Sequence, residues 1–322
     1  MILANRPITS REYKLLLKPG QFQDLNQGIK KFWSRVQAVT RSEGGTVSEP
    51  DQDEILERKT WYLDTEKFDL RRLGFVLRMR EELSRTVKGE PQILSKKNFK
   101  VTLKYRESDR YISAGRNMAF SEGVRKDEKI KTGDIDTKFE EDILPPFKSK
   151  FAHSTSVKLK QPPEIRRVAD VVRFFPGIDG LDLIQENPIK TVNTLFAHEW
   201  AYRIGKLKFG DIVKVCLSFW YEAKQTSGEP IIAEFSFDYD LDNRGENVLS
   251  DALDETLSHF SKKAAKAFPR SVFEEHFPSG LFLEDYAPDI ATGSKHLFMA
   301  MQEDEGVDLN GTTKTAFAYG ER

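Results

Sequence analysis

The segment Ser10-Arg11-Glu12-Tyr13-Lys14-Leu15-Leu16-Leu17-Lys18 alternates in the manner of a β-strand. Because successive side chains of a strand point to opposite sides, Glu12 and Lys14 share one face. Tyr13 and Leu15 share the other face. The segment therefore predicts a strand with one charged and one strongly apolar face.

The same division into a charged and an apolar face recurs along the chain. Arg78 and Arg80, for example, stand opposite Leu77 and Met79. The repetition indicates one sheet with a charged face and an apolar face. The further segments with this pattern are 76–80, 101–106, 200–204, 213–219 and 233–239.

Two architectures fit this pattern. An antiparallel sheet with one solvated face gives the same alternation. In a closed tunnel, the charged faces instead converge on a bound polyanion, and helices cover the apolar outer wall. The mixture of many cations with a few acids at separated points favours the tunnel. The cations on the charged face are Lys14, Lys18, Arg78, Arg80, Lys104, Arg106, Arg203 and Lys214, and the acids are Glu12, Glu234 and Asp238.

Composition narrows the functional classes. The chain has 322 residues, a net charge of −1 and 39% hydrophobic residues, which suits a globular protein of one large or two modest domains. A general nucleic-acid binder is usually basic, so no stable nucleic-acid partner is expected. A single cysteine, Cys216, excludes an internal disulfide framework. Without a signal peptide or membrane-length apolar run, the expected location is the cytoplasm, with no membrane partner.

Amphipathic helices are available to cover the apolar face of the sheet. Apolar residues recur at helical spacing in 21–39 and 246–268, and a further helix is expected after Pro162-Pro163. We expect one domain over 8–270 and a partly irregular C-terminal extension over 271–322, with a loose tail from Glu303. In the interval 107–160 only 138–143 has the pattern of a strand.

The order of several motifs resembles the CYTH family, also called triphosphate tunnel metalloenzymes. Ser10–Lys14 is similar to the family's opening E-x-E-x-K strand. Tyr62–Thr65 followed by Leu70–Arg80 is similar to Y-F-D-T…L-R-x-x-G-x-x-L-R-x-R, the most specific part of the match. The likeness extends through Val101–Lys104 and Tyr202-Arg203 to the acids of 234–238.

The resemblance implies an α+β fold in which an eight-stranded antiparallel β tunnel, a closed barrel, has helices packed on the outside. It also implies a triphosphate-containing small molecule as ligand and Mg²⁺ or Mn²⁺ as cofactor. We assign Lys14 and Arg80 as catalytic residues. The expected phosphate ligands are Lys14, Arg78, Arg80, Lys104, Arg106, Arg203 and Lys214, and the expected metal ligands are Glu12, Glu234 and Asp238.

Three departures from the family pattern leave the activity open. Ser10, Ser218 and Ser236 stand where the family often has acids. The leading hypothesis is metal-dependent hydrolysis of an inorganic or organic triphosphate, a phosphoric anhydride hydrolase. The alternatives are a non-catalytic polyphosphate- or nucleotide-binding module with a degraded metal site, and a class IV-like adenylate cyclase. Asp64 is expected to cap the turn that follows it rather than to bind metal.

Overall fold

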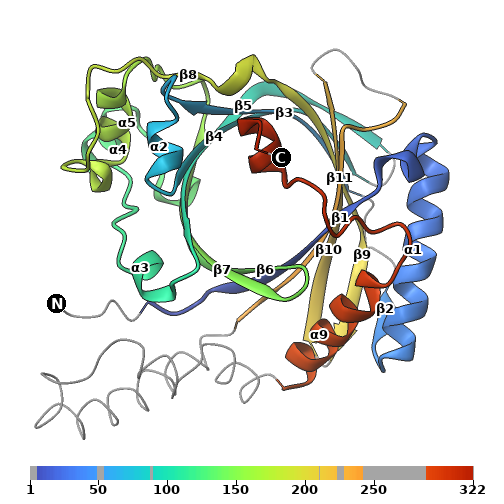
Figure 1. Cartoon of the computed structure of the whole chain (residues 1–322). Coiled ribbons are helices and arrows are strands. Elements are labelled where there is room, and N and C mark those ends of the chain that lie inside the picture. The colour runs from blue at the N-terminus through green and yellow to red at the C-terminus, as the bar shows by residue number, and fades with distance from the viewer. Residues whose placement is uncertain are drawn as a thin grey trace, which may run out of the picture.

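A closed β-barrel forms the centre of the computed structural model, which describes residues 6–48, 54–87, 90–209, 211–222, 228–241 and 288–321. Around the ring the strands follow the order β9, β10, β11, β1, β6, β7, β5, β4 and β3, and β3 pairs again with β9 (Figure 1). Two short strands, β2 and β8, extend the sheet outside the ring. The predicted closed tunnel is thereby confirmed against the open sheet.

The strands of the ring are long enough to carry charge at several depths. Their bounds are β1 Ser10–Leu17, β3 Glu54–Asp64, β4 Phe75–Val87, β5 Glu90–Glu107, β6 Ile135–Leu144, β7 Lys148–Leu159, β9 Ala197–Phe209, β10 Asp211–Glu222 and β11 Ile232–Asp240. The short outer strands are β2 Thr46–Ser48 and β8 Lys190–Thr191.

Two details of the predicted barrel are corrected. The described ring has nine strands where eight were expected, because β7 follows β6 in the interval that the sequence pattern left largely unassigned. The barrel is also mixed: β1 pairs with β6 in parallel, while the other pairs of the ring are antiparallel. Side-chain alternation has a period of two in both arrangements, so it does not distinguish them.

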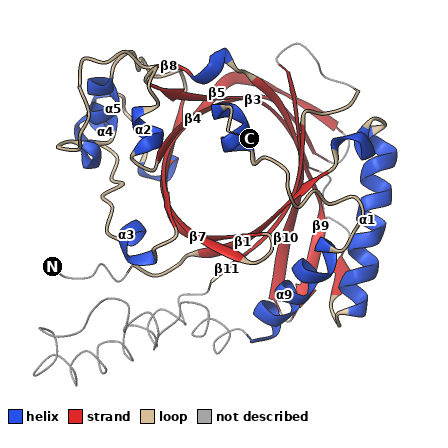
Figure 2. Ribbon diagram, viewed as in Figure 1, coloured by secondary structure: helices blue, strands red, loops and turns tan. Residues whose placement is uncertain are grey.

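Helices lie against the outer wall on two sides of the barrel (Figure 2). On one side, Phe32 and Val36 of α1 and Phe298 of α9 are buried with Leu15 and Leu217 of the wall. On the other side, helices α2, α4 and α5 bury a second cluster around Leu77 and Val101 of the wall. The bounds are α1 Leu25–Ser42, α2 Asp69–Arg72, α3 Arg110–Ala114, α4 Glu122–Asp127, α5 Val168–Phe174, α9 Pro288–Gln302 and α10 Lys314–Tyr319.

The predicted helices are partly confirmed. The helix expected over 21–39 is α1, and a 3-10 turn, η1 (Pro19–Phe22), precedes it. The helix after Pro162-Pro163 begins only at Val168. The predicted helix 246–268 and the proposed boundary at 270 lie outside the described residues. Within the described part of the chain, no helix has the length and apolar character to cross a membrane.

The loose tail expected from Glu303 is wrong. Helix α10 enters one end of the ring of strands (Figure 1). Its Ala318 and Tyr319 are buried with Tyr62, Trp220 and Ile232 of the barrel. This apolar contact places the C-terminal helix inside the barrel.

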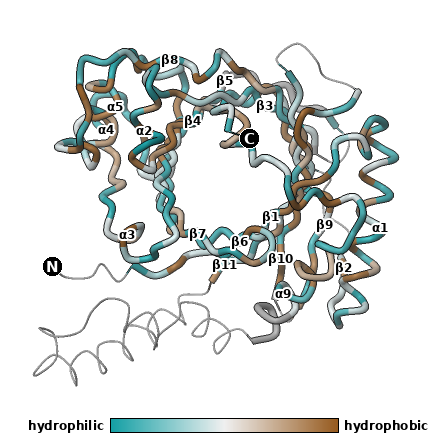
Figure 3. The backbone as a smooth tube through the Cα atoms, in the orientation of Figure 1, coloured by the Kyte–Doolittle hydropathy of each residue, from teal (hydrophilic) through white to brown (hydrophobic). Residues whose placement is uncertain are grey.

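Hydrophobic and hydrophilic residues are interspersed along the barrel strands (Figure 3). On the outward face of β1, Tyr13, Leu15 and Leu17 are all buried in the helix-covered core. On the inward face, Glu12 and Lys14 are only partly buried. Apolar burial against the helices thus fixes which face of each strand turns inward, because a one-residue slip would exchange the two faces.

Truncation of an outward core residue tests this packing. Leu217 is 0% exposed. We expect Leu217→Ala to lower the free energy of unfolding by about 2–5 kcal/mol through lost burial and a residual cavity. The same change at Leu309, which is 52% exposed, serves as the control and should have an effect within about 0.5 kcal/mol. Urea denaturation measures both, and equal effects would contradict the assigned core.

Candidate functional site

Charged side chains from most strands of the ring converge on the barrel interior. Most of the predicted site residues lie there, and four of them, Lys14, Lys104, Arg106 and Arg80, contact the buried carboxylates Asp142 and Glu199. The predicted residues placed in the interior are Glu12, Lys14, Arg78, Arg80, Lys104, Arg106, Glu234 and Asp238.

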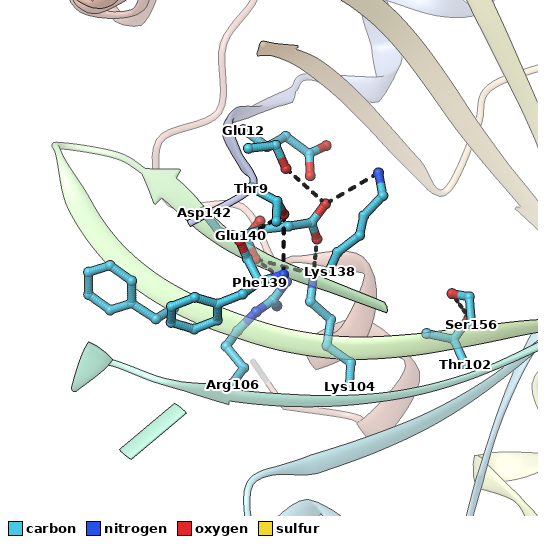
Figure 4. A network of polar contacts seen from close by, with 12 residues as sticks. Thr9, Glu12, Thr102, Lys104, Arg106, Lys138, Phe139, Glu140, Asp142 and Ser156 are labelled. Atoms are coloured by element: carbon cyan, nitrogen blue, oxygen red, sulfur yellow. Dashed lines mark hydrogen bonds and ion pairs between the residues drawn. The ribbon is translucent and has the colours of Figure 1, made fainter. Parts of the chain in front are cut away.

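The carboxylate of Asp142 on β6 is the centre of the first group. Lys14 Nζ lies 2.7 Å from its Oδ1. Lys104 Nζ lies 3.5 Å from its Oδ2, and Arg106 donates a hydrogen bond to Oδ2 (Figure 4). Burial alone raises the pKa of Asp142, but the three cations hold it well below its usual range. Asp142 is therefore an anion that fixes three predicted phosphate ligands in place.

Glu199 on β9 is the centre of the second group. It is fully buried and accepts a hydrogen bond from Thr60 (2.9 Å). Arg58 lies 3.2 Å away, Lys314 lies 3.3 Å away and Arg80 lies 3.5 Å away. Burial raises the pKa of Glu199, but Arg58, Arg80 and Lys314 outweigh it and keep the pKa well below the ordinary value.

Other cations of the interior have no such partner. Arg78 and Lys100 make no ion pair with a residue that the structure describes, and Lys100 stands directly opposite Arg80 on the neighbouring strand. Burial, together with Arg78 and Arg80, lowers the pKa of Lys100 to about 8. Like charges opposite each other destabilise a sheet. Within the described part of the chain, Arg78 and Lys100 thus lack a carboxylate partner, and Arg80 shares Glu199 with Arg58 and Lys314. These three side chains, Arg78, Arg80 and Lys100, form the part of the interior that would gain most from a bound anion.

Guanidinium groups in the interior also keep hydrogen-bonding capacity. Among the described residues, the buried Nε atoms of Arg58, Arg78, Arg80 and Arg106 donate no hydrogen bond. A buried donor without an acceptor is unfavourable by about 1–3 kcal/mol. Several such donors in one enclosed space indicate a site for a ligand with many acceptor oxygens.

Two carboxylates form an acidic pair on the adjacent strands β1 and β11. Glu12 is directly opposite Asp238, and on its own strand it also contacts Lys14 at 2.6 Å. Burial, followed by the charge of Glu12, raises the pKa of Asp238 to about 6. Burial is the larger cause of this raised pKa, and the neighbouring carboxylate of Glu12 adds to it more than Lys214 offsets.

Three of the predicted site residues are paired with oppositely charged side chains of the chain itself and not with Asp142 or the acidic pair. Arg203 is bonded to Glu54 at 2.7 Å with its side chain 64% exposed, and Lys214 is bonded to Asp240. Among the described residues, neither cation is within ion-pair distance of Asp142 or Glu199. Glu234 lies in the interior, but its Oε1 accepts a hydrogen bond from Lys314 at 3.0 Å.

The serines at the expected acid positions are all buried. Ser10 donates a hydrogen bond to Glu140 at 3.3 Å, and Ser218 is bonded to Lys314. Glu140, from β6, also contacts Lys104 at 3.4 Å. A carboxylate from another strand thus lies next to the position where the sequence motif has lost one.

Sequence reasoning missed several charged residues of the interior. Glu140 belongs to the correctly suspected strand 138–143, and Glu199 is on the same face as Arg203, four residues away, so alternation alone would have found both. Lys100 lies on the same face as Lys104 and Arg106 of the expected strand 99–106, so alternation would have found it as well, whereas Arg58 precedes the segments that the pattern covered. Lys314 had no sequence signal, because its place depends on the tertiary packing of α10. The missed residues are Arg58, Lys100, Glu140, Asp142, Glu199 and Lys314.

The predicted capping role of Asp64 is observed. Its carboxylate accepts hydrogen bonds from the backbone N–H groups of Thr65, Leu70 and Arg71 at 2.7–3.0 Å, and from the hydroxyl of Tyr319 at 3.2 Å. Asp64 therefore joins helix α2 to the C-terminal helix.

No family model and no curated protein matches the chain. Among solved structures, the chain is similar to a candidate adenylyl cyclase from Hippeastrum that is described as having a dominant triphosphatase activity. The two share 11% sequence identity, the match covers 77% of this chain and 87% of that one, and the TM-score is 0.36. The chain is also similar to a candidate adenylate cyclase from Bacillus halodurans, with 14% identity, coverage of 84% and 100%, and a TM-score of 0.31.

The two activities in these descriptions are among those that the resemblance to the CYTH family implies. At such identities and TM-scores, the likenesses carry no argument about this chain's activity. The arrangement of its own side chains has to supply that argument.

Removal of the Glu199 charge tests whether this carboxylate neutralises the cations around it. We expect Glu199→Gln to lower the free energy of unfolding by about 3–5 kcal/mol, because it leaves buried cations without their carboxylate. Added tripolyphosphate should then raise the melting temperature more for the variant than for the wild type. Glu164→Gln at an 82% exposed side chain is the control, with an expected change within about 1 kcal/mol. A variant as stable as the wild type would contradict the proposed role of Glu199.

The pKa of Asp238 predicts a pH dependence of stability. A carboxyl whose folded-state pKa is raised contributes stability below its unfolded pKa, and this contribution is lost as the pH rises through the folded value. The contribution of Asp238 should therefore disappear between about pH 4 and pH 6. Asp238→Asn should lack this loss, so that the variant gains stability relative to the wild type across this range. Thermal denaturation at several pH values measures the difference, and a constant difference would disprove the shift.

Proposed function

We propose that the chain is a metal-dependent hydrolase of triphosphate compounds, inorganic or organic, which bind in the cationic barrel interior. The observation that carries the proposal is the group of Arg78, Arg80 and Lys100, three partly buried cations. Among the described residues, only Arg80 of the three has a carboxylate partner, Glu199, and shares it with Arg58 and Lys314. A triphosphate supplies closely spaced anionic oxygens that match this arrangement.

The arginines suit phosphate chemistry. A guanidinium stays charged when buried and donates paired hydrogen bonds to phosphate oxygens. Arg78 and Arg80 project from one strand, and Lys100 faces Arg80 from the next. We propose that these three side chains hold the phosphates and stabilise charge that develops during transfer, while Lys14, Lys104 and Arg106 border the site around Asp142.

The acidic pair of Glu12 and Asp238 fits a hard divalent cation. Mg²⁺ is usually held by one or two carboxylates together with phosphate oxygens and waters, so a larger cluster of protein ligands is not required. No group of three or more potential ligands occurs in the described part of the chain. A bound Mg²⁺ or Mn²⁺ would polarise the phosphoryl group and promote attack by water.

A non-catalytic polyphosphate-binding module is the second candidate. It is favoured by Ser10, Ser218 and Ser236, which reduce the number of metal-binding acids but leave the phosphate-binding cations intact. A class IV-like adenylate cyclase stays the third, because no described contact singles out a site for an adenine base.

The proposed partner is a triphosphate-containing small molecule in the cytoplasm. The near-neutral composition supports the expectation that nucleic acid is not a stable partner.

Substitution of Arg80 tests the proposal. Charge-assisted hydrogen bonds contribute about 1.5–3 kcal/mol each, so Arg80→Ala should weaken tripolyphosphate binding about tenfold to a hundredfold. The loss should occur with and without Mg²⁺, because the guanidinium contacts phosphate directly. Isothermal titration calorimetry measures it. The control, Lys190→Ala, changes a lysine that is 62% exposed and should retain wild-type affinity.

Product analysis separates the three candidates. The wild type is incubated with tripolyphosphate, thiamine triphosphate and ATP in the presence of Mg²⁺ or Mn²⁺. Release of free phosphate is the expected result. Binding without turnover would support the module, and cyclic AMP with pyrophosphate would identify a cyclase. If Arg80→Ala binds tripolyphosphate as tightly as the wild type, the barrel interior is not the phosphate site.

A further inference from the structure

Lys314 of the C-terminal helix lies in an acidic corner of the barrel interior. Its Nζ is 3.0 Å from Glu234 Oε1 and 3.3 Å from Glu199 Oε1, and it is also bonded to the Ser218 hydroxyl. The side chain is only 12% exposed. An ammonium group has three donors, and these three oxygens satisfy all of them.

The ammonium also lies above an aromatic ring. Its Nζ is 5.8 Å from the ring centroid of Trp220, and Trp220 is directly opposite Glu199 on the neighbouring strand. A cation above an aromatic face is stabilised, and more so when it is removed from water. The corner therefore surrounds one positive charge with two carboxylates, a hydroxyl and an indole ring.

Helix α10 is firmly attached, so Lys314 is held in this corner by more than its own contacts. At the far end of the helix, the hydroxyl of Tyr319 donates to Asp64 at 3.2 Å. Glu321 binds the Arg71 guanidinium through two hydrogen bonds of 2.6–2.7 Å. Asn193 donates to the Ala318 carbonyl at 2.9 Å.

We propose that the Lys314 ammonium takes the place of a divalent cation between Glu199 and Glu234, so that the barrel binds a metal ion only at Glu12 and Asp238. The inference rests on the proposed function, in which the interior holds a triphosphate with its metal. It removes Glu234 from the predicted metal ligands and assigns it to an internal cation instead.

Electrostatics disfavours a second metal in this corner. A divalent ion next to Glu234 would meet the ammonium of Lys314, and the other cations around Glu199 are Arg58 and Arg80. Ser218 stands where a further carboxylate would strengthen metal binding, and a hydroxyl brings no negative charge. Among the described residues, no cation lies within ion-pair distance of both Glu12 and Asp238; Lys214 stands opposite Asp238 but is bonded to Asp240. Lys14 is within ion-pair distance of Glu12 and of Asp142, but not of Asp238.

Removal of the ammonium provides the test. Binding of Mn²⁺ to the full chain, without substrate, is counted by electron paramagnetic resonance of the free ion. Lys314→Met should bind one more Mn²⁺ than the wild type, because Glu199 and Glu234 then lack their ammonium. Adding Glu234→Gln to Lys314→Met should abolish the extra site. Lys190→Met is the surface control and should bind as many ions as the wild type.

Single acid substitutions test the same inference without altering Lys314. Glu234→Gln should leave Mn²⁺ affinity within about a factor of two of the wild type, whereas Glu12→Gln should weaken it by tenfold or more, about 1.4 kcal/mol. The inference is overturned if Glu234→Gln weakens Mn²⁺ binding as much as Glu12→Gln. It is also overturned if a folded Lys314→Met variant gains no site.

Failure of the inference differs from failure of the proposed function. Phosphate release by the wild type together with metal binding at Glu234 would refute only the role of Lys314. An inactive wild type with an extra Mn²⁺ site in Lys314→Met would support the role of Lys314 and refute the hydrolase.

Discussion

The structure depends on the compensation of positive charge that the barrel encloses. Transfer of an isolated ammonium or guanidinium group from water into a protein interior is strongly unfavourable. Two fully buried carboxylates, Asp142 and Glu199, each face three cations. These two groups allow a ring of strands to turn many charged side chains inward and still close.

The carboxylates compensate the enclosed positive charge unevenly, and this determines where the interior could bind an anion or a cation. Around Asp142 and Glu199 the cations are fixed by partners within the chain. At Arg78 and Lys100 they are not, and at Glu12 and Asp238 the excess charge is negative. The interior thus has one region suited to an anion and another suited to a cation, as recognition of a metal–triphosphate complex would require.

The fold was predictable where charged and apolar side chains alternate along a single strand. β1, β4, β10 and β11 each combine charged inward residues with large apolar outward residues, and the closed barrel follows from that pattern. Strand β7 was missed because much of it, Ser154-Thr155-Ser156 included, is neutral and buried on both faces, so no contrast between faces marks it. The parallel pairing of β1 with β6 could not be predicted, because side chains alternate in the same way in parallel and antiparallel strands.

For the site, the sequence predicted side chains whose position depends on one strand and missed those that depend on the closed structure. Lys14, Arg78 and Arg80 were found from their own strands. Lys314 was not, because only the anchoring of α10 by Asp64 and Arg71 brings it to Glu199. Arg203 satisfied the same alternation rule but lies closer to Glu54 than to the buried carboxylates, since alternation gives the face of a strand and not the depth along it.

The position of β1 between β6 and β11 has a kinetic consequence. Arg11 of β1 contacts Tyr239, 228 residues further along the chain, and Glu141, 130 residues further along. Each edge of β1 therefore pairs with a strand that is distant in the sequence, β11 on one side and β6 on the other. Topologies dominated by such long-range pairings fold slowly, since the entropy of large loops is lost before native contacts offset it. Until then, the apolar face and both open edges of β1 are exposed, and a nascent chain in that state is prone to aggregation and a natural client for chaperones.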